Sequence, residues 1–172
     1  MRGLIDRKIK AMVTLNRARV NYLDKFQKLI AEYNAGSKNI EALFEELVRF
    51  MQSLNAEDRR AMSEGLSEEE LALFDLLTKP DPTLSKKEEA KVKKVARGLL
   101  GTLKREKLVL AWRRRQQSRQ AVRLCIEEVL DTLPRAYTPE VYQRKCDLTY
   151  QHVYDKYFGE GRSVYAAAGQ AA

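Results

Sequence analysis

Residues 111–133 read AWRRRQQSRQAVRLCIEEVLDTL, a basic first half that runs into an apolar second half without proline or glycine. The apolar side chains of the second half recur at helical spacing and cover more than one side of a helix: Val122, Ile126, Val129 and Leu133, widened by Ala121, Leu124, Cys125 and Leu130. We therefore predict one helix over this stretch, with its second half in the core. The arginine-rich first half carries too many charges to bury and should form an exposed end suited to phosphate.

The composition is that of a globular helical protein. The chain has 172 residues, of which 44% are apolar and 33% charged, and this length is enough to bury a core. Only 8 glycines and 4 prolines are present, and no long segment alternates apolar and polar residues as a strand would. The fold class is therefore predicted to be all-α, an irregular bundle of about six helices in a single domain over residues 1–165.

Apolar spacing also predicts how the two ends of the chain behave. Residues 2–34 have apolar positions three or four apart, which predicts one long first helix. Its middle turn, with Asn16 and Arg19, is polar, and this break favours a helix that projects beyond its own core. Residues 40–54 carry the strongest amphipathic pattern of the chain and predict a second helix. Residues 166–172 are rich in alanine and are expected to be a disordered tail.

Local motifs mark where further helices begin and end. Three of them are N-terminal caps: Ser67 with Glu70, Ser85 with Glu88, and Thr138 followed by Pro139. Residues 79–83, KPDPT, cannot be helical and are expected to form a corner within one domain. Residues 104–107 are expected to break the helix before the central stretch, with one continuous helix as the alternative.

Charge is distributed unevenly along the chain, whose formal net charge is +8. Residues 86–123 hold 14 Lys and Arg against 3 Glu, whereas residues 41–75 hold 3 Arg against 10 acidic residues. The basic segment suits a phosphate backbone or an acidic partner, and a solvated charged face is the alternative. The candidate phosphate or nucleic-acid ligands are Arg113, Arg114, Arg115, Arg119 and Arg123.

The predicted last helix, which begins after Thr138, is rich in tyrosine. Tyrosine rings cover apolar area while their hydroxyl groups stay in water, which fits either the edge of a domain or a docking surface. The candidate docking residues are Tyr150, His152, Tyr154 and Tyr157. His152 is the only histidine, and a structural role explains it more simply than a catalytic one, because no nucleophile or metal-ligand pattern accompanies it.

The sequence carries no pattern that predicts catalysis. Residues 98–104, GLLGTLK, have the wrong glycine spacing for a phosphate-binding loop and follow no strand, so close helix packing is the better explanation of both glycines. Residues 89–91, EAK, lack the upstream Asp that a metal-dependent nuclease needs. The acidic side chains of residues 41–46 form a solvated helix face rather than a catalytic pair. We therefore predict no catalytic residue and no metal site.

Cysteine usage and hydropathy bear on the compartment. Cys125 and Cys146 lie within helical patterns and lack metal-ligand spacing, so free, buried thiols in a reducing environment are expected. No stretch approaches the roughly 20 apolar residues of a membrane helix, and the first ten residues carry charges where a signal sequence is apolar. A cytoplasmic protein without membrane contact is predicted.

Three stretches resemble the C-terminal helical region of the R (restriction and motor) subunit of type I restriction-modification enzymes. They are EGLSEEELALFDLLTKP at 64–80, KLVLAWRRRQQSRQAVRLCIEEVLDTLP at 107–134 and YQRKCDLTYQHVYDKYFGEGRSVY at 142–165. The resemblance runs from Tyr33 to Tyr165, is thinner over the first long helix and is absent from the alanine tail.

The resemblance implies a fragment of a larger machine. The R subunit of the family is an ATP-dependent DNA translocase and endonuclease that acts on a core of modification and specificity subunits. Its nuclease centre, phosphate-binding loop and helicase motifs lie upstream and match no residue here. The resemblance therefore implies no enzyme activity and no cofactor in this fragment, with ATP and Mg belonging to the parent subunit.

Two functions from different classes follow from the resemblance and the charge pattern. The first is an assembly domain that packs on the upstream helicase domains and helps to attach the subunit to the methyltransferase core of M and S subunits. The alternative is a module that binds DNA or nucleotide phosphate with the basic face from Arg113 to Arg123. The specificity subunit sets the DNA target in this family.

Overall fold

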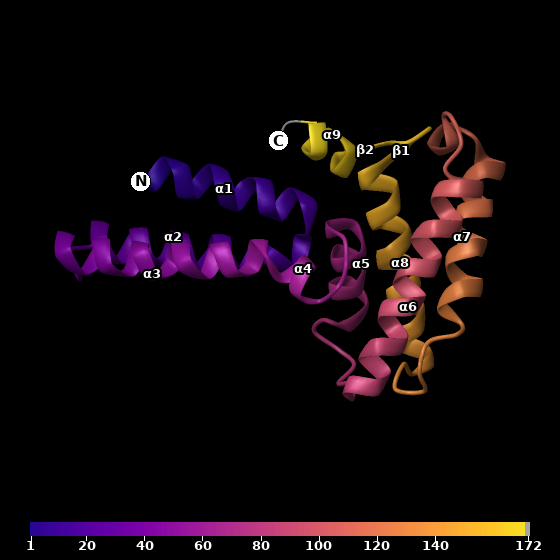
Figure 1. Ribbon diagram of the computed structural model, residues 1–172, viewed down its shortest axis with the longest axis horizontal. Helices are drawn as coiled ribbons and strands as arrows, with labels where there is room; N and C mark the ends of the chain where they lie inside the picture. The colour runs from indigo at the N-terminus through magenta and orange to yellow at the C-terminus, as the bar shows by residue number, and fades with distance from the viewer. Residues whose placement is uncertain (171–172) are drawn as a thin grey trace. The chain divides into compact units, whose positions relative to one another are not determined.

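A computed structural model describes residues 1–170, and most of that length is helical (Figure 1). The all-α prediction is confirmed in the main, with a two-stranded hairpin added near the C-terminus. The described residues form nine α-helices where about six were expected, since one predicted helix is broken and two short helices were not foreseen. The chain consists of two compact units, residues 1–67 and residues from 68 onward.

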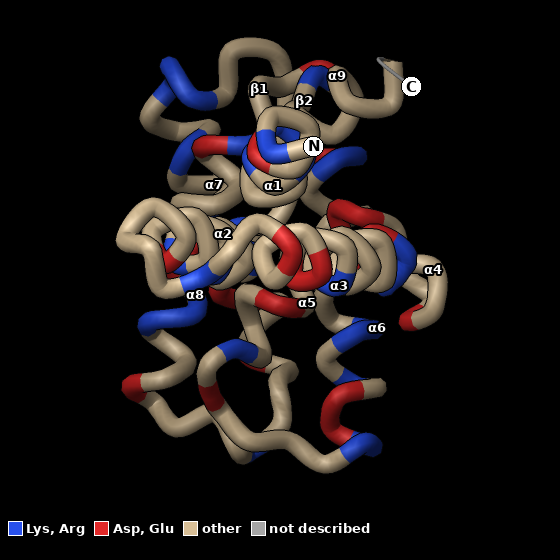
Figure 2. The backbone as a smooth tube through the Cα atoms, turned by 90° about the vertical axis from the view of Figure 1, so that its left-hand side faces the viewer, with Lys and Arg blue, Asp and Glu red and all other residues tan. Residues whose placement is uncertain are grey.

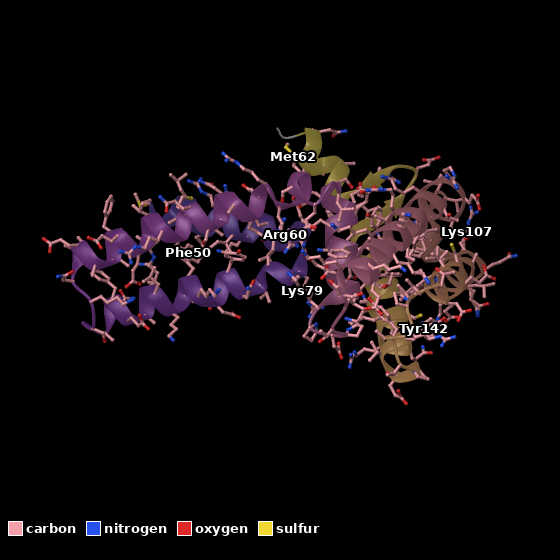
Figure 3. All side chains as sticks on the ribbon, turned by 60° about the horizontal axis from the view of Figure 1, so that its bottom comes forward. Phe50, Arg60, Met62, Lys79, Lys107 and Tyr142 are labelled. Carbon is pink, nitrogen blue, oxygen red and sulfur yellow. The ribbon has the colours of Figure 1, made fainter. Side chains whose placement is uncertain are left out.

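The first unit is a small helical bundle. Its elements are α1 (Arg2–Leu15), the 3-10 turn η1 (Arg17–Arg19), α2 (Val20–Asn34), α3 (Ile40–Asp58) and α4 (Arg60–Ser63). Its buried apolar residues are Ile5, Ile9, Met12, Phe26, Leu29, Ile30, Leu47 and Leu54. The ring of Phe50, which is labelled in Figure 3, stacks on that of Phe26 at 5.8 Å and meets Tyr22 edge-on at 6.2 Å. These aromatic contacts join α3 to α2.

The prediction of one long helix over residues 2–34 is wrong. Asn16 has extended backbone angles, φ −146° and ψ 105°, and its side chain accepts the N–H of Ala18 at 3.1 Å. An asparagine side chain that bonds its own backbone competes with the helix. Arg19 is buried and donates to the Glu57 carboxylate at 2.9 Å, which fixes the reversal. Helix α1 therefore packs on α2 and α3 instead of projecting.

The second unit is a four-helix bundle with a C-terminal hairpin. Its main helices are α5 (Glu68–Thr78), α6 (Lys86–Thr102), α7 (Gln116–Leu130) and α8 (Pro139–Lys156). The contacts form a closed ring, because α5 packs on α6, α6 on α7, α7 on α8, and α8 on α5 (Figure 1). The chain ends with the antiparallel strands β1 (Tyr157–Gly159) and β2 (Arg162–Ser163) and helix α9 (Val164–Gln170).

The central stretch 111–133 is not one helix, as had been predicted. Ala111 has φ 55°, the 3-10 turn η3 (Trp112–Arg114) follows, and Arg115 is extended before α7 begins. The fully buried Trp112 donates its indole N–H to the Tyr157 carbonyl at 3.1 Å, a contact that a continuous helix would break. The apolar part is confirmed as core by the buried residues Val122, Cys125, Ile126 and Leu130, while Leu124 is exposed.

Several local predictions are confirmed. Ser85 and Glu88 make both bonds of a capping box at the start of α6. Thr138 accepts the N–H of Val141, with proline in the first turn of α8. The break at 104–107 is confirmed by a π-helical turn, η2 (Leu103–Lys107), that ends α6. Both cysteines are free and buried.

The C-terminal tail and the two glycines of α6 differ from expectation. Residues 166–170 belong to α9 and are not disordered, while residues 171–172 lie outside the described residues. The glycines are not sites of close packing. A Cβ added at Gly98 would meet nothing within 4 Å, and one at Gly101 would meet only the Arg105 guanidinium at 3.8 Å. The exclusion of a phosphate-binding loop stands, because residues 98–104 are helical.

The C-terminal end of α5 is capped by two side chains that come from a distant part of the sequence, in and just before α8. Lys145 of α8 donates from Nζ to the carbonyl oxygens of Leu76 and Lys79, each at 2.8 Å. The Tyr137 hydroxyl donates to the Leu77 carbonyl at 2.9 Å. Lys145 is fully buried, and this burial lowers the pKa of its ammonium group. The last carbonyls of a helix carry partial negative charge and need such donors.

Replacing Lys145 with methionine should destabilise the second unit. Methionine keeps the apolar stem but leaves two carbonyl groups without a donor, which costs about 1–3 kcal/mol each when they stay buried. Urea unfolding should therefore show a lower midpoint for Lys145→Met, while the exposed control Lys91→Met should stay within about 0.5 kcal/mol of the parent. Equal midpoints for Lys145→Met and the parent would refute the cap.

Gly98→Ala should stabilise the protein. The site is exposed, helical and open, so alanine gains helix propensity of about 0.5–1 kcal/mol without a clash. Thermal unfolding followed by circular dichroism measures the change. A lower melting temperature would mean that a neighbour does pack on this glycine.

Candidate functional site

Arginine and aromatic side chains from η3, α7, α8 and β1 form one contiguous row. The Arg123 guanidinium lies 5.6 Å from the centre of the Tyr150 ring, and the Tyr150 and Tyr154 rings are 6.3 Å apart. The Arg113 guanidinium lies 5.4 Å from the Tyr154 ring and 4.8 Å from the Phe158 ring. We call these five residues the arginine–tyrosine ladder. Stacking of this kind holds each guanidinium face in place while leaving its edges open to acceptors.

Three of the five candidate phosphate ligands are engaged within the unit. Arg113 donates to the Tyr154 carbonyl at 3.2 Å, and Arg119 donates to the Arg113 carbonyl at 2.8 Å. Arg123 forms ion pairs with Glu127 and Asp147, and the hydrogen bond to Asp147 raises its pKa. Arg114 and Arg115 are exposed, and neither forms an ion pair with another described residue. The predicted basic face is thus reduced to these last two arginines.

The four candidate docking residues separate into two pairs. His152 and Tyr157 are buried, at 9% and 3% exposure, and the Tyr157 hydroxyl donates to the Glu69 carboxylate at 3.4 Å. They pack inside the unit and cannot form the predicted surface, because they lie on the side of α8 and the start of β1 that the bundle covers. Tyr150 and Tyr154 are half-buried members of the ladder and keep part of their rings in water.

Helix α3 has a row of exposed apolar side chains. They belong to the amphipathic stripe predicted for residues 40–54. Ile40, Phe44 and Val48 are 68%, 56% and 36% exposed, although they belong to the strongest apolar pattern of the chain. They lie four residues apart and so form a continuous line along the helix. Leu47 and Leu54, on the neighbouring side, are buried against α1 and α2. The apolar stripe of α3 is therefore wider than the part of its surface that α1 and α2 cover.

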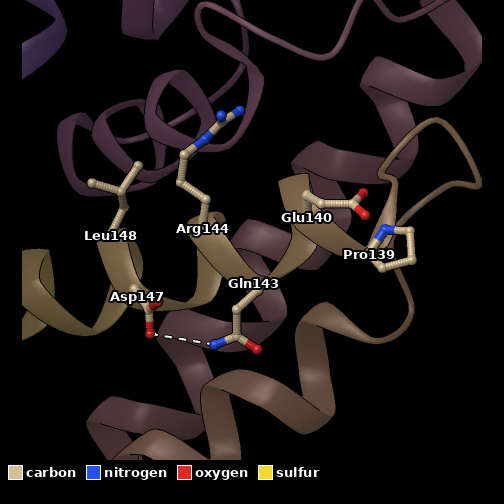
Figure 4. Close-up of a pocket in the computed structure, with 6 residues that line it drawn as sticks. All are labelled: Pro139, Glu140, Gln143, Arg144, Asp147 and Leu148. Carbon is tan, nitrogen blue, oxygen red and sulfur yellow. Dashed lines mark hydrogen bonds between the residues drawn. The ribbon is translucent and has the colours of Figure 1, made fainter.

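The surface of α8 holds a shallow hollow (Figure 4). It is lined by Pro139, Glu140, Gln143, Arg144, Asp147 and Leu148, all from this one helix. The Gln143 amide donates to the Asp147 carboxylate at 3.4 Å, and Asp147 also pairs with Arg123 of α7. A small-molecule site normally has walls that converge from several elements. The hollow is therefore a surface feature of the helix.

Within residues 1–170, no group of three or more His, Cys, Asp or Glu side chains is arranged so that it could hold a metal ion. None of the described helices is both long and apolar enough to span a bilayer. Charged residues are unevenly distributed among the helices, with acidic residues along α3 and α5 and mostly basic ones along α6 (Figure 2).

Comparison with protein-family models gives a match that covers most of the chain. The model for the C-terminal part of type I restriction enzyme HindI endonuclease subunit-like proteins matches residues 1–155, most of the chain. The chain belongs to this family. The resemblance seen in the sequence is confirmed; the match extends it to residue 1 and ends at residue 155, before the predicted limit at Tyr165. No curated protein and no solved structure matches the chain.

In this type I restriction C-terminal domain the single histidine is held neutral. Burial lowers the pKa of His152 to about 4, with the nearby Lys156 adding to the effect and Asp155 opposing it. Its Nε2 atom has no hydrogen-bond partner among the described residues, and neither has the Thr149 hydroxyl one turn earlier. Both groups lie on the buried side of α8. The structural role expected for His152 stays a prediction, and its burial supports that prediction.

The neutral histidine makes stability depend on pH. The unfolded chain binds a proton at His152 near pH 6.5, whereas the folded chain does so only near the lowered pKa of about 4. Stability should therefore be complete above pH 6.5 and fall as the pH drops from there towards 4. Urea midpoints at several pH values should fall from about pH 7 to about pH 5, and His152→Gln should flatten this dependence. The C2 proton of the only histidine should titrate near pH 4 by NMR, and a midpoint above 6 would contradict its burial.

Proposed function

We propose that this domain docks the endonuclease subunit of a type I restriction enzyme onto its methyltransferase core of M and S subunits. The observation that carries the proposal is the exposed apolar row of α3, together with membership of the C-terminal family of that subunit. On this proposal the domain supplies attachment and no chemistry. ATP, Mg and the nuclease centre would then serve upstream parts of the subunit.

The α3 row has the form of a helical docking face. An amphipathic helix that binds a groove presents large apolar side chains about one turn apart, with an aromatic anchor near the middle. Ile40, Phe44 and Val48 meet this description, with Phe44 at the centre. The polar rim beside them is charged, because Glu45 and Arg49 are largely exposed and pair at 3.4 Å. Charged rims around an apolar centre are typical of specific interfaces.

Magnitude also favours a partner for this row. Full burial of one large apolar side chain contributes about 1.5–3 kcal/mol. Three such side chains, left one-third to two-thirds exposed, therefore forgo a few kcal/mol that a partner surface would recover. Single exposed apolar residues need no explanation, whereas a contiguous line of them marks an interaction site.

The ladder supports a second, smaller contribution to docking. Tyr150 is half-exposed and is held by Arg123, so its ring is preorganised to meet a partner at low entropic cost. The alternative function, phosphate binding by the basic face from Arg113 to Arg123, is favoured by one observation. Arg114 and Arg115 are exposed and make no ion pair within the described part of the chain.

Removing the apolar row should weaken capture by the methyltransferase core. The double variant Ile40→Ser with Phe44→Ser should bind an immobilised core of M and S subunits at least about tenfold more weakly, because two anchors are lost. Met62→Ser is the matched control, since Met62 is 85% exposed in the same unit and lies outside α3. Both variants should keep the parent's urea midpoint.

The outcomes separate the two docking surfaces. Undiminished capture of the α3 double variant would exclude the row as the docking face. If Tyr150→Ala weakens capture and the α3 variant does not, the ladder is the docking surface and the assignment to α3 is wrong.

A further inference from the structure

The segment between α6 and α7 presents two apolar side chains within a cluster of cations. Residues 104–115 read KREKLVLAWRRR, with six Lys and Arg against the single acid Glu106. Leu108 and Trp112 are buried, whereas Val109 and Leu110 between them are 45% and 48% exposed. The buried side chains of Leu108 and Trp112 anchor the chain on either side of this exposed pair, which forms an apolar tip. We call Val109 and Leu110 the tip.

The backbone beneath the tip is fixed by the hairpin. The Leu108 carbonyl accepts the N–H of Glu160 at 3.1 Å, and the Val109 carbonyl accepts the N–H of Trp112 at 3.1 Å. Gly159 passes so close that a Cβ there would lie 2.5 Å from the Val109 oxygen. Since these carbonyls are already bonded, the tip is held out towards solvent by a rigid support. A rigid apolar tip loses little conformational entropy when it inserts into a partner.

Cations lie on both sides of the tip, and several are not used internally. Lys104 pairs with Glu69 at 2.8 Å, and Arg113 is stacked in the ladder. Lys107 on one side, and Arg114 and Arg115 on the other, form no ion pair with any described residue. Lys107 lies at an outer edge of the second unit (Figure 3). The tip is therefore flanked by available positive charge in both chain directions.

The chemistry of this surface fits the minor groove of a nucleic-acid duplex. Proteins that bind there insert one or two apolar side chains between base steps, while cations contact the phosphates on either side. Arginine forks match phosphate oxygens well. We propose that residues 107–115 are a DNA contact in which Val109 and Leu110 enter the minor groove. Lys107, Arg114 and Arg115 bind the flanking phosphates.

The size of the tip decides against the other anionic partners. A stable protein interface buries about 800 Å² on each partner, and two half-exposed aliphatic side chains supply only a small part of that area. Stable membrane attachment needs two signals, such as two acyl chains or one acyl chain with a polybasic patch, and an acyl chain contributes about 0.8 kcal/mol per buried methylene group. Two half-exposed aliphatic side chains offer far fewer such groups than one acyl chain. A base step needs only one or two wedging side chains. The inference is independent of the docking function assigned to α3.

The test measures binding of the chain to a fluorescent duplex of about 20 base pairs across a salt series. Val109→Ser with Leu110→Ser should raise the Kd about tenfold and leave the salt dependence unchanged, because no charge is lost. Arg114→Gln with Arg115→Gln should reduce the slope of log K against log salt by about 1.8, which corresponds to two phosphate contacts. Lys87→Gln with Lys91→Gln removes the same charge from exposed positions of α6 and is the control, expected to change the Kd less than about twofold.

A second readout follows the shape of the duplex. Insertion at a base step bends DNA, so dyes at the two ends should come closer when the parent chain binds, and the tip variant should lose this change. The proposal fails if the parent does not bind the duplex at about 50 mM salt, or if the tip variant binds and bends like the parent. It also fails if the α6 control loses as much affinity as the arginine pair. Tip-dependent capture by phosphatidylserine vesicles without duplex binding would assign the surface to lipid instead.

Discussion

The second unit depends on the ammonium group of Lys145 at the end of α5. Helix α5 stops where the KPDPT segment begins, so its last carbonyls lose their intrahelical donors in a buried place. Lys145 supplies the missing donors from α8, and the Tyr137 hydroxyl adds another just before α8 begins. These bonds join the first helix of the bundle to the last. The ring of four helices is thereby closed by polar contacts as well as by apolar packing.

Sequence patterns predicted those parts of the fold that short-range chemistry decides. The starts of α6 and α8 follow from Ser85 and Thr138, because each cap bonds a backbone group three residues away. The two failed helices, 2–34 and 111–133, break where no proline or glycine stands. One break is stabilised by a buried ion pair between residues 38 apart, and the other by an indole hydrogen bond between residues 45 apart. Such partners are known only once the chain is folded.

The candidate site shows the same division. Residue type and charge density singled out an arginine-rich stretch and a tyrosine-rich helix as separate features, and the structure brings the two together as a ladder. Which guanidinium groups remain available depends on the pairing of α7 with α8, so Arg113 and Arg123 could not be separated from Arg114 in advance. Likewise, the exposure of Phe44 depends on how far α1 and α2 extend over α3. In the sequence, only the width of the apolar stripe over residues 40–54 indicated that part of it would be exposed.

The position of Trp112 also has a practical side. It is the only tryptophan of the sequence, it is fully buried, and its indole N–H is bonded to the Tyr157 carbonyl. The emission spectrum of an indole depends on such surroundings, and nearby tyrosines such as Tyr154, whose ring meets Trp112 edge-on, can transfer excitation to it. The protein therefore contains an intrinsic optical probe at the junction between the cationic segment and the hairpin, and a change at that junction would alter the colour of its fluorescence without any label.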